Sequence, residues 1–577
     1  MIFSKNIFCI KTLEILIILI TLILFFLNII CFSKGYPALD EGYYYLISKY
    51  PDFTLTTTLF QYYTRLIFVL CSWNIFAIRI LGFLILLLSN CYFYMQLPKV
   101  FSLLGEYLKE SRINYSLYIC FSSTGILYYY YIFPRTISYN MLVVVFSTIA
   151  LAFLIKSYIN QSKLYFSVVG FCIASIFFIK ATSSFILLIL ILLVIIINKK
   201  FFINRIIMLG IGALLGLLFC FCLVQRNPFE PIFSALLISK YLPDTVTPNG
   251  ILIATKYYFL TVWEYYYPLF ITVIILFFVK KKIEKADGCK TPSLDRIYYY
   301  SLLLQFLFLT ISVLSFISEN GPYKTQNDYA FGYLAPSYIF IGFMGMAIIV
   351  ILLEFKNFYL ARYQILIALI VFIYILTAGI GTASHYLYAT KHFLGLLMPF
   401  IFIFIIFIYK KSKDRLLYIF TIVIFVFISV YLNFYALNHS YSENKSFFEQ
   451  NVKLTQENSI IYVDRNIYET LFELKAALIK NNFTDGQQIF GLSMPGIIYM
   501  LGGSAYNGGW YRFEDRLPLL FGYFKENTSS FIIPWIITKS GEEQSISEFL
   551  KNYGIYFPRN YDFCKEINGY TLWKLNR

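Results

Sequence analysis

The run Ile15-Leu-Ile-Ile-Leu-Ile-Thr-Leu-Ile-Leu-Phe-Phe-Leu-Asn-Ile-Ile-Cys31 decides the fold, because it contains no charged residue. As a helix it approaches the roughly 20 residues needed to cross a hydrocarbon core about 30 Å thick. Lys5 and Lys11 precede it, and no small-residue cleavage site follows it. We therefore expect a retained membrane helix rather than a cleaved signal peptide.

The whole chain has the composition of such segments. Its 577 residues are 59% hydrophobic, 20% aromatic and 14% charged, with a mean hydropathy of +0.69. Soluble domains carry about 25% charged residues, so a soluble globular protein is excluded. Apolar runs of spanning length recur along the chain and predict about thirteen membrane spans. They cover residues 15–31, 76–95, 115–133, 137–154, 164–179, 185–197, 206–224, 258–279, 298–317, 333–353, 365–380, 393–408 and 416–435.

Short basic clusters in alternate loops indicate the orientation, for example Lys156/Lys163, Lys280–Lys282 and Lys410/Lys411. Lys and Arg are retained on the cytoplasmic side, so we expect a cytoplasmic N-terminus. An odd number of spans then places the C-terminal segment outside what we interpret as a bacterial inner membrane. These loops explain much of the formal net charge of +16 without a nucleic-acid partner.

Residues 438–577 differ from residues 1–437 in texture and predict a separate extracytoplasmic domain. Strands are expected at 460–463, 488–492 and 531–538, and helices at 468–480 and 545–553. Alternation of strand and helix indicates a small α/β domain. The predicted fold class is an all-α polytopic transmembrane bundle with a small C-terminal α/β domain. Cys564 is the only cysteine of this domain, so no disulfide is expected within it.

The acidic pair Asp40-Glu41 lies just after the first span, in an outer loop predicted at residues 32–75. Carboxylates beside a membrane core are costly and are therefore candidates for function. In the same loop, residues 59–70 are too short and too aromatic to span, so they predict an interfacial helix. The alternative is one long span from Leu59 to Met95, which Ser72-Trp73-Asn74 would have to interrupt.

Two further outer tips each carry one cation at membrane depth, namely Arg135 and Lys180. Such a cation either extends to the interface or faces an internal cavity or an anion. Arg79, Lys324 and Lys391 are further cations expected on that side. No metal site is predicted on the histidines, because His385, His392 and His439 have no metal-ligand spacing.

The first outer loop resembles that of the GT-C superfamily of multispan glycosyltransferases, which includes protein mannosyltransferases and aminoarabinose transferases. The similarity lies in the acidic pair Asp40-Glu41 with its following tyrosines, and in Arg79 within Ala77-Ile-Arg-Ile-Leu81. The Ser138-Tyr-Asn140 tip, the Lys180 tip and Ala378-Gly-Ile-Gly-Thr382 are similar to bacterial members with this layout. Thr56-Thr-Thr-Leu-Phe60 replaces the His-Pro-Pro of many relatives, which leaves the donor sugar and the acceptor open.

The resemblance implies that a sugar is transferred from a polyprenyl-phosphate donor to a lipid, glycan or protein acceptor at the extracytoplasmic face, among membrane lipids. A carboxylate that takes up the acceptor proton contributes about 10² to 10⁴ in rate, and Asp40 is the predicted base. Glu41 is predicted to orient Asp40, to hold the sugar or to bind a divalent cation, the one cofactor left open. Fixed cations stabilise the departing phosphate. The predicted phosphate ligands are Arg135, Lys180, Arg79 and Lys391, and the predicted substrate contacts are Tyr43, Tyr44, Tyr139 and Asn140.

Two other functions remain open from the sequence. A lipid-linked substrate transporter or flippase is expected to show internal repeats and charged residues near the bilayer centre. The sequence shows no such repeat, and its ionisable residues gather at the predicted rim. In a non-catalytic envelope assembly protein, the acidic pair would be dispensable.

Overall fold

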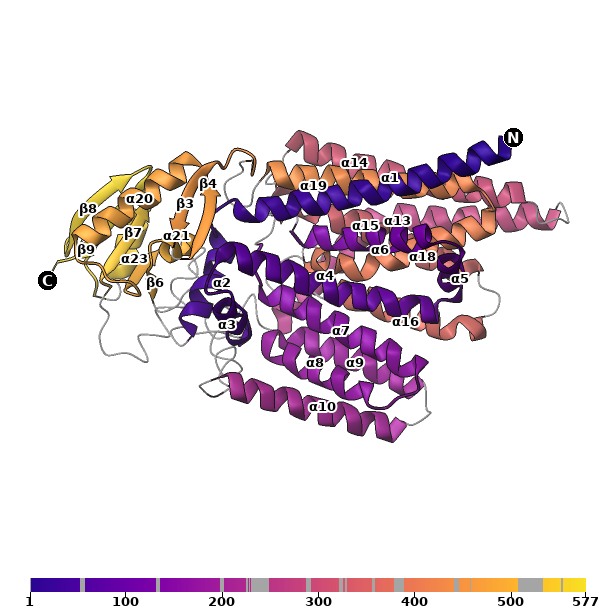
Figure 1. Ribbon diagram of the computed structural model, residues 1–577, viewed down its shortest axis with the longest axis horizontal. Helices are drawn as coiled ribbons and strands as arrows, with labels where there is room; N and C mark the ends of the chain where they lie inside the picture. The colour runs from indigo at the N-terminus through magenta and orange to yellow at the C-terminus, as the bar shows by residue number, and fades with distance from the viewer. Residues whose placement is uncertain are drawn as a thin grey trace.

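The computed structural model is a helical bundle that carries a small domain of strands and helices at one end (Figure 1). The N-terminus lies at the opposite end of the bundle from the C-terminal domain (Figure 1). The structure describes residues 2–51, 58–130, 135–197, 202–224, 227, 229, 248–286, 292–320, 325–326, 329–354, 358–377, 389–439, 446–456, 458–506, 533–551 and 554–576.

Within the described residues, each predicted span overlaps a helix of the bundle, so the all-α membrane part of the predicted fold class is confirmed. In the described part of the chain, eight helices are long and apolar enough to cross a membrane, and three apolar helices are shorter. The bundle helices are α1 (Ile2–Ile30), α4 (Ile75–Val100), α6 (Arg112–Leu127), α7 (Tyr139–Ile159), α8 (Tyr165–Ile179), α9 (Ala181–Ile197), α10 (Phe202–Leu223), α13 (Pro248–Ala286), α14 (Pro292–Asn320), α15 (Phe331–Glu354), α16 (Phe358–Thr377), α18 (Leu394–Ser412) and α19 (Arg415–Asn438).

The first loop forms two short helices, α2 (Leu39–Lys49) and α3 (Phe60–Leu70), before α4 begins. Ser72 and Trp73 have φ of 51° and 60°, a left-handed conformation that ends a helix. Asn74 then caps α4, because its side chain accepts a hydrogen bond from Ala77 N at 2.9 Å. The predicted break is confirmed, and the alternative of one long span is wrong.

The C-terminal domain contains a five-stranded sheet in the order β6-β5-β7-β9-β8, parallel across β6-β5-β7 and antiparallel beyond. A separate hairpin, β3-β4, lies next to the bundle. The predicted α/β character of the domain is therefore confirmed. Its elements are β3 (Val452–Gln456), β4 (Ser459–Val463), α20 (Arg465–Lys480), β5 (Gln488–Gly491), α21 (Pro495–Met500), β6 (Ser504–Ala505), β7 (Trp535–Lys539), α23 (Glu543–Lys551), β8 (Tyr561–Ile567) and β9 (Tyr570–Leu575).

Four of these strands, β3, β6, β8 and β9, were not predicted from the sequence. The β8-β9 hairpin had a readable signal in its turn, Asn568-Gly569. Both turn residues have positive φ, 49° and 77°, which is the requirement of a type I′ turn. Asn-Gly between two aromatic-rich runs is the strongest short-range hairpin pattern, and it would have located both strands.

The domain is bonded to the ends of the bundle helices. Gly35 N donates to Tyr462 O at 2.8 Å, and Ile75 N donates to Ser459 Oγ at 2.9 Å. The Asn458 side chain also donates to Ser72 O at 3.2 Å. Thus β4 and the turn before it hold both the chain that enters α2 and the start of α4.

Candidate functional site

The two residues of the acidic pair point into different surroundings. Asp40 and Glu41 both lie in the first turn of α2, where the helix dipole favours negative charge. Successive residues of an α-helix are rotated by about 100°, since a turn takes 3.6 residues. Asp40 is half-buried, whereas Glu41 is 6% exposed and faces the interior.

Glu41 forms a two-bonded ion pair with Arg79 of α4. Arg79 Nε donates to Glu41 Oε1 at 2.8 Å, and Nη2 donates to Oε2 at 3.0 Å. The other N–H groups of Arg79 donate to the carbonyls of Phe32, Lys34 and Gly35 at 2.8 to 3.1 Å. A guanidinium has five N–H donors, and all five are used within the chain. Arg79 therefore braces the segment before α2 and has no donor left for a substrate phosphate.

Arg135 lies near the ion pair of Glu41 and Arg79. Its Nη1 donates to Cys31 O at 2.6 Å, and its guanidinium carbon is 3.6 Å from the centre of the Phe447 ring. Arg135 is 4% exposed, and the charges of Arg79 and Glu41 act on its guanidinium group. It thus joins the end of α1 to the segment that leads into the C-terminal domain. No sequence pattern predicted this contact.

Asp40 faces a different group of side chains. Burial raises the pKa of Tyr43, and the nearby Tyr139 and the charge of Asp40 raise it further. The Asp40 carboxylate also lies near Lys391, where its charge partly opposes the effect of burial on that lysine. Tyr44 packs its ring against Tyr139 at 6.2 Å between ring centres. Hence the predicted substrate residues Tyr43, Tyr44 and Tyr139 do gather near Asp40.

Two lysines from distant parts of the chain meet beside this group. Lys180 ends α8, where its N–H donates to Ile176 O at 2.6 Å. Burial lowers the pKa of Lys180 to about 7. Lys391 is fully buried in the short helix η4 (Lys391–Phe393). The next residue, His392, lies close enough to both lysines to interact with them electrostatically. The first loop and the start of α18 therefore place Asp40 near Lys391, and the α8–α9 tip places Lys180 near the adjacent His392.

His392 was missed as a site residue, because it shows no metal-ligand spacing in the sequence. Its ring packs on Tyr129, with ring centres 5.0 Å apart. Tyr129 bonds Ser138, whose hydroxyl accepts from Met141 N at 3.1 Å and caps α7. The one sequence signal was its position directly after Lys391.

A close crossing between α6 and the start of α18 fixes the position of η4. A Cβ on Gly125 of α6 would lie 2.6 Å from Leu394 O, and one on Gly395 would lie 2.7 Å from Asn90 Oδ1. Tyr94 OH also donates to Gly395 O at 2.9 Å. The start of α18 is thereby held at backbone contact with α6, directly after Lys391 and His392.

The remaining residues of interest lie as follows. Tyr128, Tyr129 and Tyr130 are at most 3% exposed and lie within the core. Asn140 is half-buried at the start of α7. Lys324, His385, Tyr131 and residues 378–382 lie outside the described residues.

The arrangement disfavours a metal at Glu41, since both carboxylate oxygens are bonded to Arg79. Across the described ranges, no three His, Cys, Asp or Glu residues are grouped as metal ligands. The lysines near Asp40 would also repel a cation.

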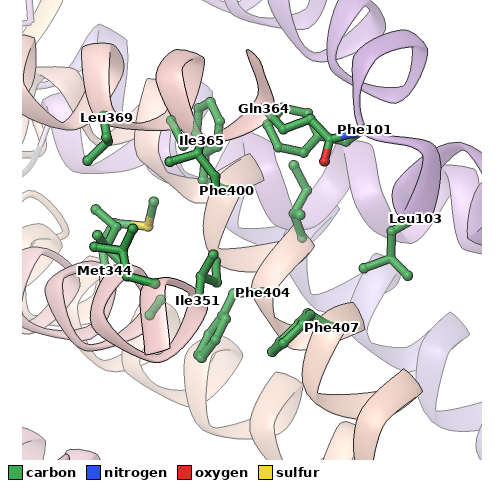
Figure 2. Close-up of a pocket in the computed structure, with 15 residues that line it drawn as sticks. Phe101, Leu103, Met344, Ile351, Gln364, Ile365, Leu369, Phe400, Phe404 and Phe407 are labelled. Carbon is green, nitrogen blue, oxygen red and sulfur yellow. The ribbon is translucent and has the colours of Figure 1, made fainter. Parts of the chain in front are cut away.

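An apolar pocket lies farther along the bundle, near the end of α4 and between α15, α16 and α18 (Figure 2). Its cavity volume is about 100 Å³, and Figure 2 shows Phe101, Phe400, Phe404 and Phe407 around it. Its amide, Gln364, donates to Val100 O at 3.0 Å. The lining offers neither a base nor a cation, so the pocket is not a candidate for the reaction centre.

The chain was compared with known proteins. No family model matches it, and no curated protein does. It is similar to the crystal structure of ArnT from Cupriavidus metallidurans in the apo state, with 10% identity, 97% of each chain covered and a TM-score of 0.44. It is also similar to ArnT from the same organism bound to undecaprenyl phosphate, with 11% identity, 97% of each chain covered and a TM-score of 0.42.

Proposed function

We propose that the protein is a membrane glycosyltransferase that moves a sugar from a polyprenyl-phosphate donor to an acceptor at the extracytoplasmic face. The observation that carries the proposal is that half-buried Asp40 lies near buried Lys391, and that buried Lys180 lies near His392, the residue after Lys391. A base and two cations in one protected place are what the transfer of a sugar from a phosphate requires. The acceptor is a lipid, a glycan or a protein.

The transfer exchanges one bond for another at the anomeric carbon. The acceptor hydroxyl oxygen forms a bond to that carbon while the bond from the carbon to the phosphate oxygen breaks. Asp40 takes up the hydroxyl proton, and the electron pair of the broken bond leaves with the polyprenyl phosphate. Asp40 later returns its proton to water.

The lysines act on the leaving group. Negative charge develops on the phosphate as the bond breaks, and fixed ammonium groups stabilise it most where water is scarce. We assign this role to Lys391 and Lys180, and the sugar contacts to Tyr43, Tyr139 and Asn140. Tyr44 is 4% exposed and packs on Phe60 at 5.5 Å between ring centres, so it shapes the wall of the site.

The sequence-based roles of the other three residues change. We assign Arg79 to positioning rather than phosphate binding, because its donors are all used. We also assign positioning roles to Arg135, because it donates to Cys31 O, and to Glu41, because it is paired with Arg79. The chemistry therefore depends on Asp40 alone of the acidic pair.

The test compares cell-envelope lipids and glycans by mass spectrometry. Four strains are needed: wild type, one without the protein, one with Asp40→Asn and one with Glu449→Gln as an exposed carboxylate control. We expect one sugar-bearing product to disappear without the protein, to fall about 10² to 10⁴-fold with Asp40→Asn, and to persist with the control. An unchanged envelope without the protein overturns the proposed function, and normal product from Asp40→Asn overturns the base.

A further inference from the structure

We infer that the C-terminal domain is a working part of the site, because its helix α21 positions the helix that carries Asp40. The contact is a glycine-on-glycine crossing between Gly42 of α2 and Gly496 of α21. This inference rests on the proposed function for the role of Asp40. It differs from a role of the domain in acceptor recognition, because it concerns the geometry of the base.

The two helices touch through their backbones. A Cβ added to Gly42 would lie 2.3 Å from both Cα and N of Gly496. A Cβ added to Gly496 would lie 1.9 Å from Pro37 O. Both neighbours are backbone atoms, so neither clash can be relieved by rotating a side chain. Any side chain at either position must push α2 and α21 apart.

The same face of α2 carries further contacts to α21, which lies beside it in Figure 1. Tyr45 packs on Tyr499 with ring centres 5.0 Å apart, and Lys49 Nζ lies 5.7 Å from the same ring. Gly42, Tyr45 and Lys49 follow the i, i+3, i+7 spacing of one helix face. Asp40 and Tyr43 belong to a different face. Movement of α21 would therefore shift Asp40 without touching its neighbours directly.

The backbone just before Asp40 is strained. Leu39 has φ of 41°, in the left-handed region that a leucine rarely adopts. Such a conformation persists only where the surroundings hold it, and it is common near functional sites. On one side Arg79 holds the carbonyls of residues 32, 34 and 35. On the other side Gly496 lies against the carbonyl of Pro37, so the turn into α2 is held from both sides.

A small displacement is enough to matter. A misplacement of about 1 Å in a catalytic geometry can lower the rate by about 10²-fold. Lys180 directly follows α8 and Lys391 lies in η4, whereas the crossing joins α2 and α21. Gly496→Ala is therefore expected to lower product formation by tenfold to a hundredfold, while the affinity for a polyprenyl phosphate stays within twofold of wild type.

The experiment uses full-length protein in lipid nanodiscs and in cells. For Gly496→Ala and Gly42→Ala it measures binding of undecaprenyl phosphate, the thermal unfolding midpoint, hydrogen exchange of the α2 amides and the envelope product. Leu550→Ala is the control for loss of domain stability, because Leu550 is fully buried in α23 away from α2. Gly210→Ala is the control for the substitution itself, because a Cβ there meets nothing within 4 Å.

The inference is supported if both crossing variants lose product and exchange α2 amides faster while binding undecaprenyl phosphate normally, and both controls keep their product per folded protein. Normal product from Gly496→Ala overturns it. An equal loss of product from Leu550→Ala also overturns it, because the domain would then act through stability alone. If wild type makes no product, the proposed function fails, and unchanged α2 exchange in Gly496→Ala still refutes the contact.

Discussion

Replacing Glu41 by glutamine separates the roles of the two neighbouring carboxylates. Glu41→Gln keeps the shape of the side chain but removes the charge that balances Arg79, which is 1% exposed. In the wild type, guanidinium N–H groups of Arg79 donate to both oxygens of Glu41 at 2.8 to 3.0 Å. In Glu41→Gln one of these oxygens is replaced by an NH₂ group, so two donors face each other. Removing one partner of a buried ion pair costs about 3 to 5 kcal/mol. Because whole domains are stable by about 5 to 15 kcal/mol, the protein should be strongly destabilised.

The assay is unfolding of the purified protein in mixed micelles of rising SDS content, followed by circular dichroism. Arg79→Met should cost at least as much as Glu41→Gln, because the carbonyls of Phe32, Lys34 and Gly35 also lose their donors. The double variant should cost less than the sum of the two, with a coupling of about 1 to 3 kcal/mol. Asp40→Asn should change stability by less than about 1 kcal/mol. Wild-type stability of Glu41→Gln together with lost product would refute the division of roles.

Two further predictions concern the basic residues. Burial lowers the pKa of Lys180 to about 7, so in the free protein this lysine loses its positive charge as the pH rises above 7. Above that pH, binding of a phosphate must be accompanied by uptake of a proton at Lys180. Undecaprenyl phosphate affinity measured from pH 7 to 9 should fall by up to tenfold per unit, and Lys180→Arg should abolish the slope; a flat wild-type profile contradicts the assignment. Arg135→Leu should destabilise the protein by about 1 to 3 kcal/mol with less than threefold change in that affinity, whereas Lys391→Met should weaken binding at least tenfold. The reverse pattern would return Arg135 to the phosphate site.

Much of the fold followed from local patterns. The spans, the break at Ser72-Trp73 and the helix α20 each depend on residues close in sequence. The strand β6 was missed because it has only two residues. The strand β3 was missed although Val452 and Leu454 alternate with polar residues and it pairs with the next strand, β4. The β8-β9 hairpin was missed although its Asn-Gly turn was readable.

The candidate site was predictable in its residue types but not in its grouping. Asp40, Lys180 and Lys391 were identified from their predicted side of the membrane, and Tyr43 and Tyr139 from the family resemblance. The structure brings Asp40 near Tyr43, Tyr139 and Lys391, and brings Lys180 near His392. Arg79 and Arg135 have the same chemistry and the same predicted side, yet their partners are carbonyls and Glu41. The acceptor of a buried cation is chosen by packing between helices, which no local pattern encodes.

The sequence by itself determined that this is a polytopic membrane protein with a small α/β domain at its C-terminal end, because apolar length and alternation are local quantities. Only the tertiary structure decided which partners the two members of the acidic pair have. Asp40 and Glu41 are neighbours in the chain, but one helical step turns them to different partners. Arg79, 38 residues away, engages Glu41, and a glycine crossing with residue 496 sets where Asp40 lies.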